Sequence, residues 1–472
     1  MKRKAAIAAA LMILLTGCSM GPKYVKPVVD APDVYRAAAP ETAHEPASLG
    51  DLKWFDVFKD EQLRNLIRTA LTRNYDLQEA VERVSAARAS LGITRSEQLP
   101  SIVGSADFTT QGNSRTGPFL LSPSFRRVRN YGGTLLNLLS FEVDVWGRLR
   151  NATAAERSLL LASEENRKSV AATLVGDVAG AYFNLLELDL ELQINKRTLA
   201  ARKDSLDLIG KNEQGGVATL LDVRQAEELV YSAAETIPQI ELEIEQTENQ
   251  INYLLGGNPG PIPRGLALTE QQQPLAVPPG LPSSLLERRP DIRAAEQSLI
   301  AANANIAVAK AAYFPRISLT GFAGFESSQL KNLFEGSNSA WNFGPQIAQP
   351  LFTGGAIKSN VRVTEAQRRI AVIAYERAIK TAFKEVSDAL LQRQKIGEIR
   401  IQQESLVNAV RDRSRLAYIR YRQGVDTLLN ALDADRTLFA AELNLAQTRR
   451  DELLALVQLY KALGGGWQYL WV

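Results

Sequence analysis

The sequence predicts a membrane protein of mixed α and β structure in which one unit is used twice. Three observations lead to this fold class. Short motifs of the first half recur in the second half, several helical patterns are far longer than ordinary globular helices, and four segments alternate between apolar and polar residues.

The motif recurrence has a constant spacing over the helical parts. Residues 216–222 (GVATLLD) return at 424–430 (GVDTLLN), and Leu-Gly-Gly at 255–257 returns at 463–465. Both offsets are 208 residues, since 424 − 216 = 463 − 255 = 208. Earlier in each copy, Leu99-Pro100 returns as Phe314-Pro315. We therefore expect two repeats, at 59–257 and 283–467.

The N-terminus is typical of an exported lipoprotein. Lys2, Arg3 and Lys4 precede an apolar run at 5–15, which is too short to span a bilayer. The run ends in Leu-Thr-Gly-Cys, which resembles a bacterial lipobox, and Ser19 is what lipoproteins destined for the outer membrane show after the cysteine. We expect a signal peptide at 1–17, covalent lipid on Cys18, and an extended arm over 18–58, whose stretch at 21–50 is rich in proline and alanine.

Composition argues against an enzyme and against nucleic acid. His44 and Cys18 are the single histidine and cysteine, so neither a Cys/His zinc cluster, a histidine-based triad nor a disulfide can form within one chain. The formal charge is +3, and loss of the three cationic side chains of the signal leaves a nearly neutral chain. A nucleic-acid partner would require a basic face.

Helical periodicity covers most of each repeat. Residues 59–99 and 283–314 are expected to be helical, each region ending at a proline (Pro100 or Pro315). Longer patterns run over 147–256 and 356–463, the first with apolar residues such as Val170, Leu174 and Val178 at spacings of four. A helix of some 64 residues would be about 95 Å long. Such lengths indicate coiled-coil packing.

Four shorter segments, at 101–112, 130–145, 316–326 and 341–352, alternate as strands do. This pattern is typical of transmembrane β-barrels, with apolar residues facing lipid. Pro345 lies inside the last segment, where we expect a bulge or a strand end. Seven prolines at 258–282 predict a linker between the repeats, and 468–472 form a C-terminal tail.

Four strands are too few to close a barrel, because single-chain outer-membrane barrels start at eight strands. An open sheet edge in lipid leaves backbone groups unpaired at several kcal/mol each. Copies must therefore pool their strands, and a cyclic homotrimer supplies twelve strands and twelve long helices.

Several motifs carry a family resemblance. Residues 21–27 after Cys18, the junction at 350–355, the run at 421–433 and the ending at 463–467 resemble the TolC/OprM-like outer-membrane factors. The resemblance covers nearly all of 18–467. It implies a homotrimer with a 12-stranded barrel in the outer membrane, continuous with a 12-helix tunnel in the periplasm.

The resemblance also implies a function and partners. The tunnel would be the passive exit duct for drugs or other small molecules, without cofactors apart from the lipid. Its helical tips would meet a periplasmic adaptor, which links to an inner-membrane RND-type pump that supplies the energy.

Site residues follow from the same resemblance. Asp433 matches an acidic gate position, Asn430 stands where some members carry a second aspartate, and Tyr421 matches a position that tethers the closed tip. Three copies of Asp433 would repel one another, so their pKa values would rise or a cation would bind. Asp222, the acidic residue of the first repeat's tip, is the fourth residue expected in the periplasmic gate. Turn and adaptor-contact residues would be Gly216, Val217, Thr219, Leu220, Gly424, Val425, Thr427 and Leu428.

Other functions remain open at this point. The same duct would serve type I-like secretion or metal export, although the three methionines (Met1, Met12 and Met20) argue against a methionine-lined copper path. A structural periplasmic coiled-coil lipoprotein without a channel is the alternative from another class.

Overall fold

The computed structural model describes residues 20–36, 48–114, 127–272 and 278–468. Cys18 and His44 lie outside these ranges, so lipidation of Cys18 stays a prediction. The chain divides into two compact units. Unit 1 comprises residues up to 27, 84–163 and 295–375; unit 2 comprises 28–83, 164–294 and 376–472.

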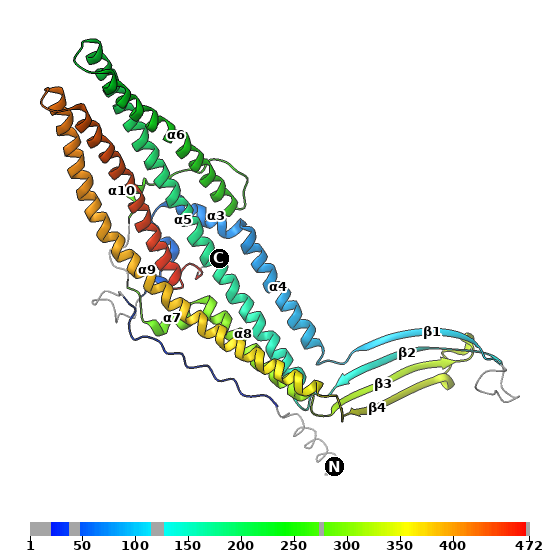
Figure 1. Ribbon diagram of the computed structural model, residues 1–472. Helices are drawn as coiled ribbons and strands as arrows, with labels where there is room; N and C mark the ends of the chain where they lie inside the picture. The colour runs from blue at the N-terminus through cyan, green and yellow to red at the C-terminus, as the bar shows by residue number, and fades with distance from the viewer. Residues whose placement is uncertain (1–19, 37–47, 115–126, 273–277, 469–472) are drawn as a thin grey trace. The chain divides into compact units, whose positions relative to one another are not determined.

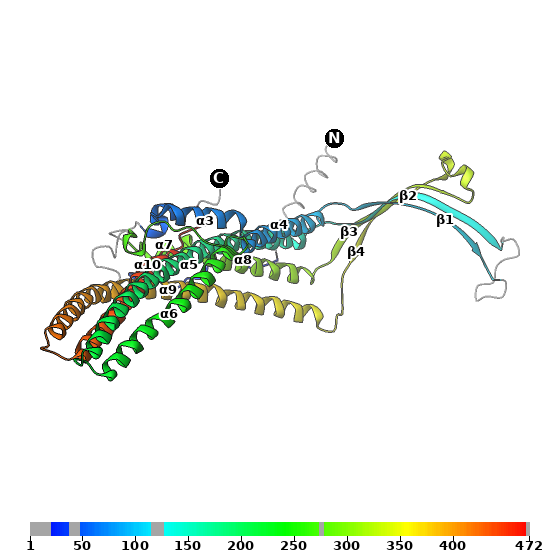
Figure 2. The same ribbon diagram turned by 90° about the horizontal axis from the view of Figure 1, so that it is seen from above.

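Unit 1 contains one four-stranded antiparallel sheet, which is curved and twisted in both views (Figures 1 and 2). Its strands are β1 (Ile102–Gly112), β2 (Val128–Glu142), β3 (Arg316–Ser327) and β4 (Ser339–Ala348). Their spatial order is β1-β2-β3-β4, so β1 and β4 form the two edges.

Two strands end earlier than the alternation predicted. β2 stops at Glu142 rather than at 145, because Asp144 turns to accept hydrogen bonds from the backbone N–H groups of Leu149 (3.1 Å) and Arg150 (2.9 Å) at the start of the next helix. β4 stops at Ala348 rather than at 352, just before Pro350, which has no N–H to donate.

The prediction of a bulge or strand end at Pro345 is wrong. Pro345 pairs with Leu319 within a ladder that runs without a register shift from Arg316↔Ala348 to Phe325↔Ser339. β4 is an edge strand, where a residue without an N–H is tolerated. The irregularity of this sheet lies between β2 and β3, where the register shifts between Leu138 and Phe141.

The first helical region, predicted as continuous over 59–99, is broken. It forms α3 (Glu61–Arg73) and α4 (Tyr75–Ser96), with Asn74 extended between them. The short helix α2 (Trp54–Val57) precedes this region and lies in the stretch predicted as an extended arm. The Asn74 side chain accepts from Leu77 N (3.0 Å) and donates to Leu254 O (3.0 Å). Asparagine competes with the helix for backbone groups in this way.

The second region, predicted over 283–314, breaks at the matching place. α7 (Pro282–Arg288) and α8 (Pro290–Ala311) are separated by Arg289, which is extended. Pro290 disfavours the helical conformation of the residue before it. Arg289 Nη1 donates to Ala462 O (3.1 Å), so in each half a side chain at the break binds a carbonyl near the end of a long helix.

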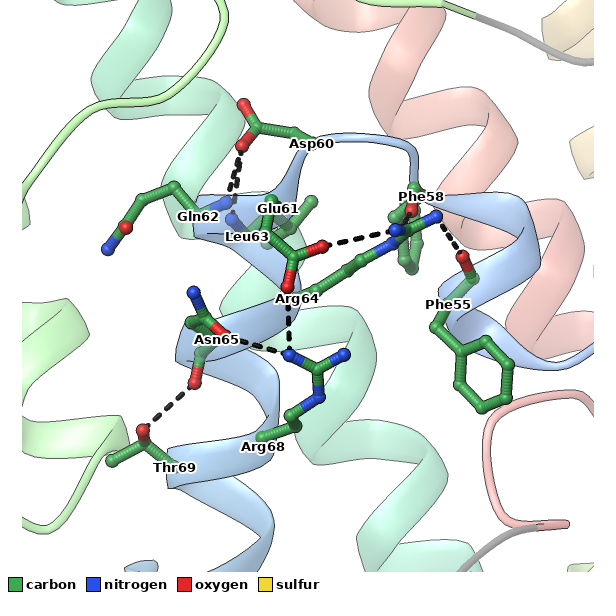
Figure 3. A network of polar contacts seen from close by, with 10 residues as sticks. All are labelled: Phe55, Phe58, Asp60, Glu61, Gln62, Leu63, Arg64, Asn65, Arg68 and Thr69. Atoms are coloured by element: carbon green, nitrogen blue, oxygen red, sulfur yellow. Dashed lines mark hydrogen bonds and ion pairs between the residues drawn. The ribbon is translucent and has the colours of Figure 1, made fainter.

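Asp60 fixes the start of α3 (Figure 3). Its carboxylate accepts from Gln62 N (2.8 Å) and Leu63 N (3.3 Å) and is 1% exposed. The same carboxylate accepts from Tyr182 OH (3.1 Å) and Leu266 N (2.9 Å), which ties the proline-rich linker to the core of unit 2.

The long helical segments are occupied by α5 (Arg148–Gln214), α6 (Leu220–Leu254), α9 (Ala356–Arg422) and α10 (Leu428–Ala462). α5 and α9 each contain 67 residues, and α6 and α10 each contain 35. Within unit 2 they form two helical hairpins, α5–α6 and α9–α10 (Figure 1). Among the described residues, α5 alone has a stretch apolar enough to cross a membrane, and 56% of that stretch is buried.

Short 3-10 turns complete the described elements: η1 (Leu49–Asp51), η2 (Leu268–Glu270), η3 (Leu330–Asn332) and η4 (Gly336–Asn338). The start of the N-terminal arm lies along α8 in unit 1. Asn303 donates to Pro22 O (2.8 Å), and Glu296 accepts from Tyr24 OH (3.2 Å) and binds Lys26 (2.9 Å).

Candidate functional site at the helical tips

Each helical hairpin reverses direction in a short turn around one glycine. Gly216 (φ 77°) and Gly424 (φ 71°) have the left-handed backbone conformation that glycine adopts without strain. Val217 N donates to Asn212 O (2.8 Å) and Val425 N to Arg420 O (3.0 Å), which closes the last helical turn in both hairpins.

The two tips begin their second helix differently. In the first tip, Thr219 and Asp222 form a reciprocal capping box: Asp222 N donates to the Thr219 hydroxyl (3.3 Å), and the Asp222 carboxylate accepts from Thr219 N (2.8 Å). Asp222 therefore caps a helix in this structure. Its predicted place in the gate stays a prediction.

In the second tip, the side-chain hydrogen bonds of the turn are made by Asp426 and no capping box forms. Thr427 makes no side-chain cap bond there. The Asp426 carboxylate instead accepts from Thr427 N (2.9 Å) and from the Asn430 side chain (2.7 Å), and it pairs with Arg420 (3.1 Å). These donors lower the pKa of Asp426, with the Asn430 bond contributing most. Asn430 thus holds the turn together.

An apolar cluster joins the two hairpins just behind the tips. Ile209 of α5, Ala226 of α6, and Leu428 and Leu432 of α10 are buried together. Tyr421 of α9 is partly buried against them. Leu428, predicted as an adaptor contact, is 4% exposed and belongs to this core. A hydrogen-bond tether by Tyr421 remains a prediction.

The outer surface of the tips is apolar. Val217, Leu220 and Leu221 of the first tip are 82%, 59% and 66% exposed, and Val425 and Leu429 of the second are 61% exposed each. Leu221 and Leu429 follow the predicted contact residues by one position. In the second tip Leu428 is buried and Leu429 is exposed, whereas both leucines of the first tip are exposed. Helical periodicity alone did not show this difference.

Asp433 is held by two arginines. Its carboxylate lies 2.7 Å from Arg413 of α9 and 3.1 Å from Arg436 of α10. Within one chain these bonds lower the pKa of Asp433, with Arg413 as the largest cause. The sequence predicted a raised pKa for three Asp433 carboxylates brought together by symmetry. It did not predict that Arg413 and Arg436 of the same chain supply positive charge beside each carboxylate.

Further ion pairs connect α10 with both neighbouring long helices. Asp435 accepts from Arg202 of α5 (2.8 Å), and the Arg202 side chain is only 5% exposed. Glu442 binds Arg197 of α5 and Arg411 of α9 (2.9 Å). Breaking such partly buried pairs leaves an uncompensated charge, so they resist separation of the hairpins.

The described contacts give the four predicted gate residues separate partners. Asp433 binds Arg413 and Arg436, Asn430 binds Asp426, Tyr421 packs on the apolar cluster, and Asp222 caps α6. Arg413 and Asp426 were not predicted; Arg413 meets Asp433 across the hairpin, which the sequence does not show directly. Within the described ranges, no group of three His, Cys, Asp or Glu residues is placed to hold a metal ion.

Comparison with known proteins decides the family. The sequence model of the outer membrane efflux protein family matches residues 66–257 and again 281–465, most of the chain. The chain belongs to the outer membrane efflux protein family. The expectation of an outer-membrane efflux protein related to TolC and OprM is therefore confirmed.

Curated relatives and solved structures agree with this assignment. The toluene efflux pump outer membrane protein TtgF of Pseudomonas putida is 39% identical over 97% of this chain and 96% of its own length. The outer membrane protein OprJ of Pseudomonas aeruginosa is 36% identical over 99% and 97%. The open-state MtrE outer membrane channel of Neisseria gonorrhoeae has a TM-score of 0.85 at 33% identity, covering 95% and 98% of the two chains.

Proposed function

We propose that three copies of this chain form the passive outer-membrane exit duct of a tripartite efflux system. The main support is the four-stranded sheet, which has two open edges, in a chain that belongs to the outer membrane efflux protein family. Unpaired edges are costly in lipid. Pairing β4 of one copy with β1 of the next in a closed ring removes them and gives twelve strands.

The helical tips are the proposed contact for a periplasmic adaptor and, through it, an inner-membrane RND-type pump. The five exposed apolar side chains of the two tips support this proposal, since exposed apolar patches mark interaction sites. Relatives named as efflux pump outer membrane proteins point to the same partners. The duct itself carries no chemistry; the pump supplies the energy.

We further propose that the α9–α10 hairpin gates the duct by moving relative to α5–α6. The Ile209 cluster and the Arg202–Asp435 and Arg197–Glu442 pairs join the two hairpins and would hold the tips closed. Asp433 and Asn430 lie near the second tip, where a ring of symmetry-related side chains would narrow the passage. Opening requires these links to break or to be replaced by adaptor contacts.

The lipid on Cys18 remains part of the proposal. The contacts of Pro22, Tyr24 and Lys26 with α8 support an arm that starts within the unit that contains the sheet. Metabolic labelling with a radioactive fatty acid tests it: the wild type should be labelled and Cys18→Ser should not. Label on the serine variant would contradict the lipid assignment.

Cells that lack their own outer-membrane efflux component test the proposed function. Expression of the full chain with a compatible adaptor and pump should lower accumulation of a fluorescent dye. Val217→Asp with Val425→Asp should abolish this effect, whereas Asp56→Ala, at an exposed position of α2, should not. Undiminished efflux by the tip variant would contradict the adaptor contact.

A further inference from the structure

One aromatic contact links the two halves of the chain beside the sheet. The Trp146 ring, in the segment that follows β2, stacks on Phe314 with a centroid distance of 4.8 Å and an angle of 25°. Its Nε1 donates to Pro315 O (2.8 Å). The segment after the second strand of the first repeat therefore packs on the helix-to-strand turn of the second repeat.

The chain contains the same two kinds of segment a second time. Leu99-Pro100, between α4 and β1, corresponds to Phe314-Pro315 between α8 and β3. Residues 349–355 follow β4 as residues 143–147 follow β2. β1 and β4 are opposite edges of the sheet, with β2 and β3 between them. Three strand spacings, about 14 Å, therefore separate the second pair of segments within one chain.

The side chains of this second pair are exposed. Leu351 and Phe352 are 93% and 92% exposed, and Leu99 is 64% exposed. Trp146 and Phe314 of the first pair are each partly covered. Two adjacent large apolar side chains at this exposure indicate a surface that another molecule covers.

We infer that Leu351 and Phe352 of one copy pack against the Leu99-Pro100 turn of the next copy. The inference rests on the proposed homotrimer and adds a side-chain contact to its strand pairing. A second copy is the occupant because β4, which ends three residues before Leu351, needs a partner strand, and the β1 edge that it would meet begins beside Leu99.

The internal repeat favours a second copy of the chain, rather than lipid, as the molecule that covers Leu351 and Phe352. The β2–β3 pairing and the Trp146–Phe314 contact occur together inside the chain, so β4–β1 pairing between copies should bring the matching segments together. One detail differs. The residue 208 positions after Trp146 is Gly354, so the large side chains of the second segment come two or three residues earlier.

Cysteine cross-linking tests the contact. Cys18 is the single native cysteine, so Leu99→Cys with Phe352→Cys in the full chain, oxidised in membranes or treated with a short bismaleimide, has few competing thiols. Denaturing gels should show covalent species of two and three chains. Each single variant, and the pair Phe352→Cys with Val128→Cys, should remain mostly single chains. Val128 pairs with Gly112 at the far end of the β1–β2 ladder, about 30 Å of strand away.

The alternatives give distinct results. If the 99/352 pair forms no adduct while an amine-reactive cross-linker still captures three chains, this inference is overturned and the trimer stands. If neither reagent links chains, the trimer proposal fails and the contact fails with it. If the two introduced thiols react but the denaturing gel still shows only single chains, the contact lies within one chain and the inference is overturned.

Discussion

The Arg413 guanidinium lies 2.7 Å from the Asp433 carboxylate, across the α9–α10 hairpin. The Arg420–Asp426 pair lies nearer the tip, with Arg420 in the last turn of α9 and Asp426 in the turn before α10. Both pairs therefore join the two arms of the same hairpin. The acidic residue of the proposed gate is thus part of a ladder of ion pairs within one chain.

Removing Arg413 should make the proposed gate more attractive to cations. Without the positive charge of Arg413, the negative charge of Asp433 is less neutralised. Three copies of Asp433 should therefore bind a divalent cation more tightly. Arg413→Ala should lower the blocking concentration of such a cation in planar bilayers, by less than about tenfold for exposed charges. Arg415→Ala is the matched control, because Arg415 pairs with Asp412 on its own helix. If the blocking concentration is the same in Arg413→Ala and Arg415→Ala, Asp433 is not a gate residue.

Asp60→Ala should destabilise unit 2 strongly. The change removes the α3 cap and leaves Tyr182 OH and Leu266 N without their acceptor in a buried place. The loss should be about 3 kcal/mol of unfolding free energy, seen as a lower thermal midpoint of the purified protein. Asp56→Ala, at an exposed position of α2, should change the midpoint little. If both variants lower the thermal midpoint by a similar small amount, the hydrogen bonds of Asp60 do not stabilise unit 2.

The two tips should respond differently to loss of their cap threonines. Thr219→Ala removes a capping box and should cost about 1 kcal/mol locally, whereas Thr427 makes no side-chain cap bond. Hydrogen exchange at the start of α6 should therefore accelerate in Thr219→Ala, while exchange at the start of α10 should stay nearly unchanged in Thr427→Ala. Equal acceleration at both tips would contradict the assigned caps.

Glu187 should make stability depend on pH. Burial, followed by the hydrogen bond and charge of Glu191, raises the pKa of Glu187 to about 8 from 4.5. The folded chain keeps a proton that the unfolded chain releases, so stability is fully present below about pH 4.5 and falls as pH rises through about 8.

Glu187→Gln should remove this dependence. The variant should gain thermal stability relative to wild type at pH 9 and show little difference at pH 5. Glu241→Gln is the control, because Glu241 is an exposed partner of Lys196. A stability difference that is the same at both pH values would contradict a protonated Glu187.

The sequence was informative where periodicity is long and turn chemistry is explicit. The helical hairpins, the glycine turns at Gly216 and Gly424 and the four strands lie where periods of 3.6 and 2 and the recurring motifs indicated. The breaks at Asn74 and Arg289 were missed, because apolar spacing continues through them while local hydrogen bonding and Pro290 end the helices.

Partners across a hairpin or between distant segments were the hardest part of the site to predict. Arg413 is 20 residues from Asp433, and Arg202 is 233 residues from Asp435. Neither pair carries a local spacing signal, and both form only when helices pack. Leu428 and Leu429 are adjacent leucines, and only the packing of α10 on Ile209 and Ala226 decides which one is buried.

Single-channel recording in planar bilayers tests the central claim most directly. Purified full-length protein, shown to be trimeric by its mass in detergent, should produce discrete conductance steps. Arg202→Ala with Glu442→Ala, which loosens the links between the hairpins, should raise the conductance or the open time. A folded trimer that inserts into the bilayer without any conductance, in wild type and in the loosened variant, would contradict the proposal that this chain forms a gated duct.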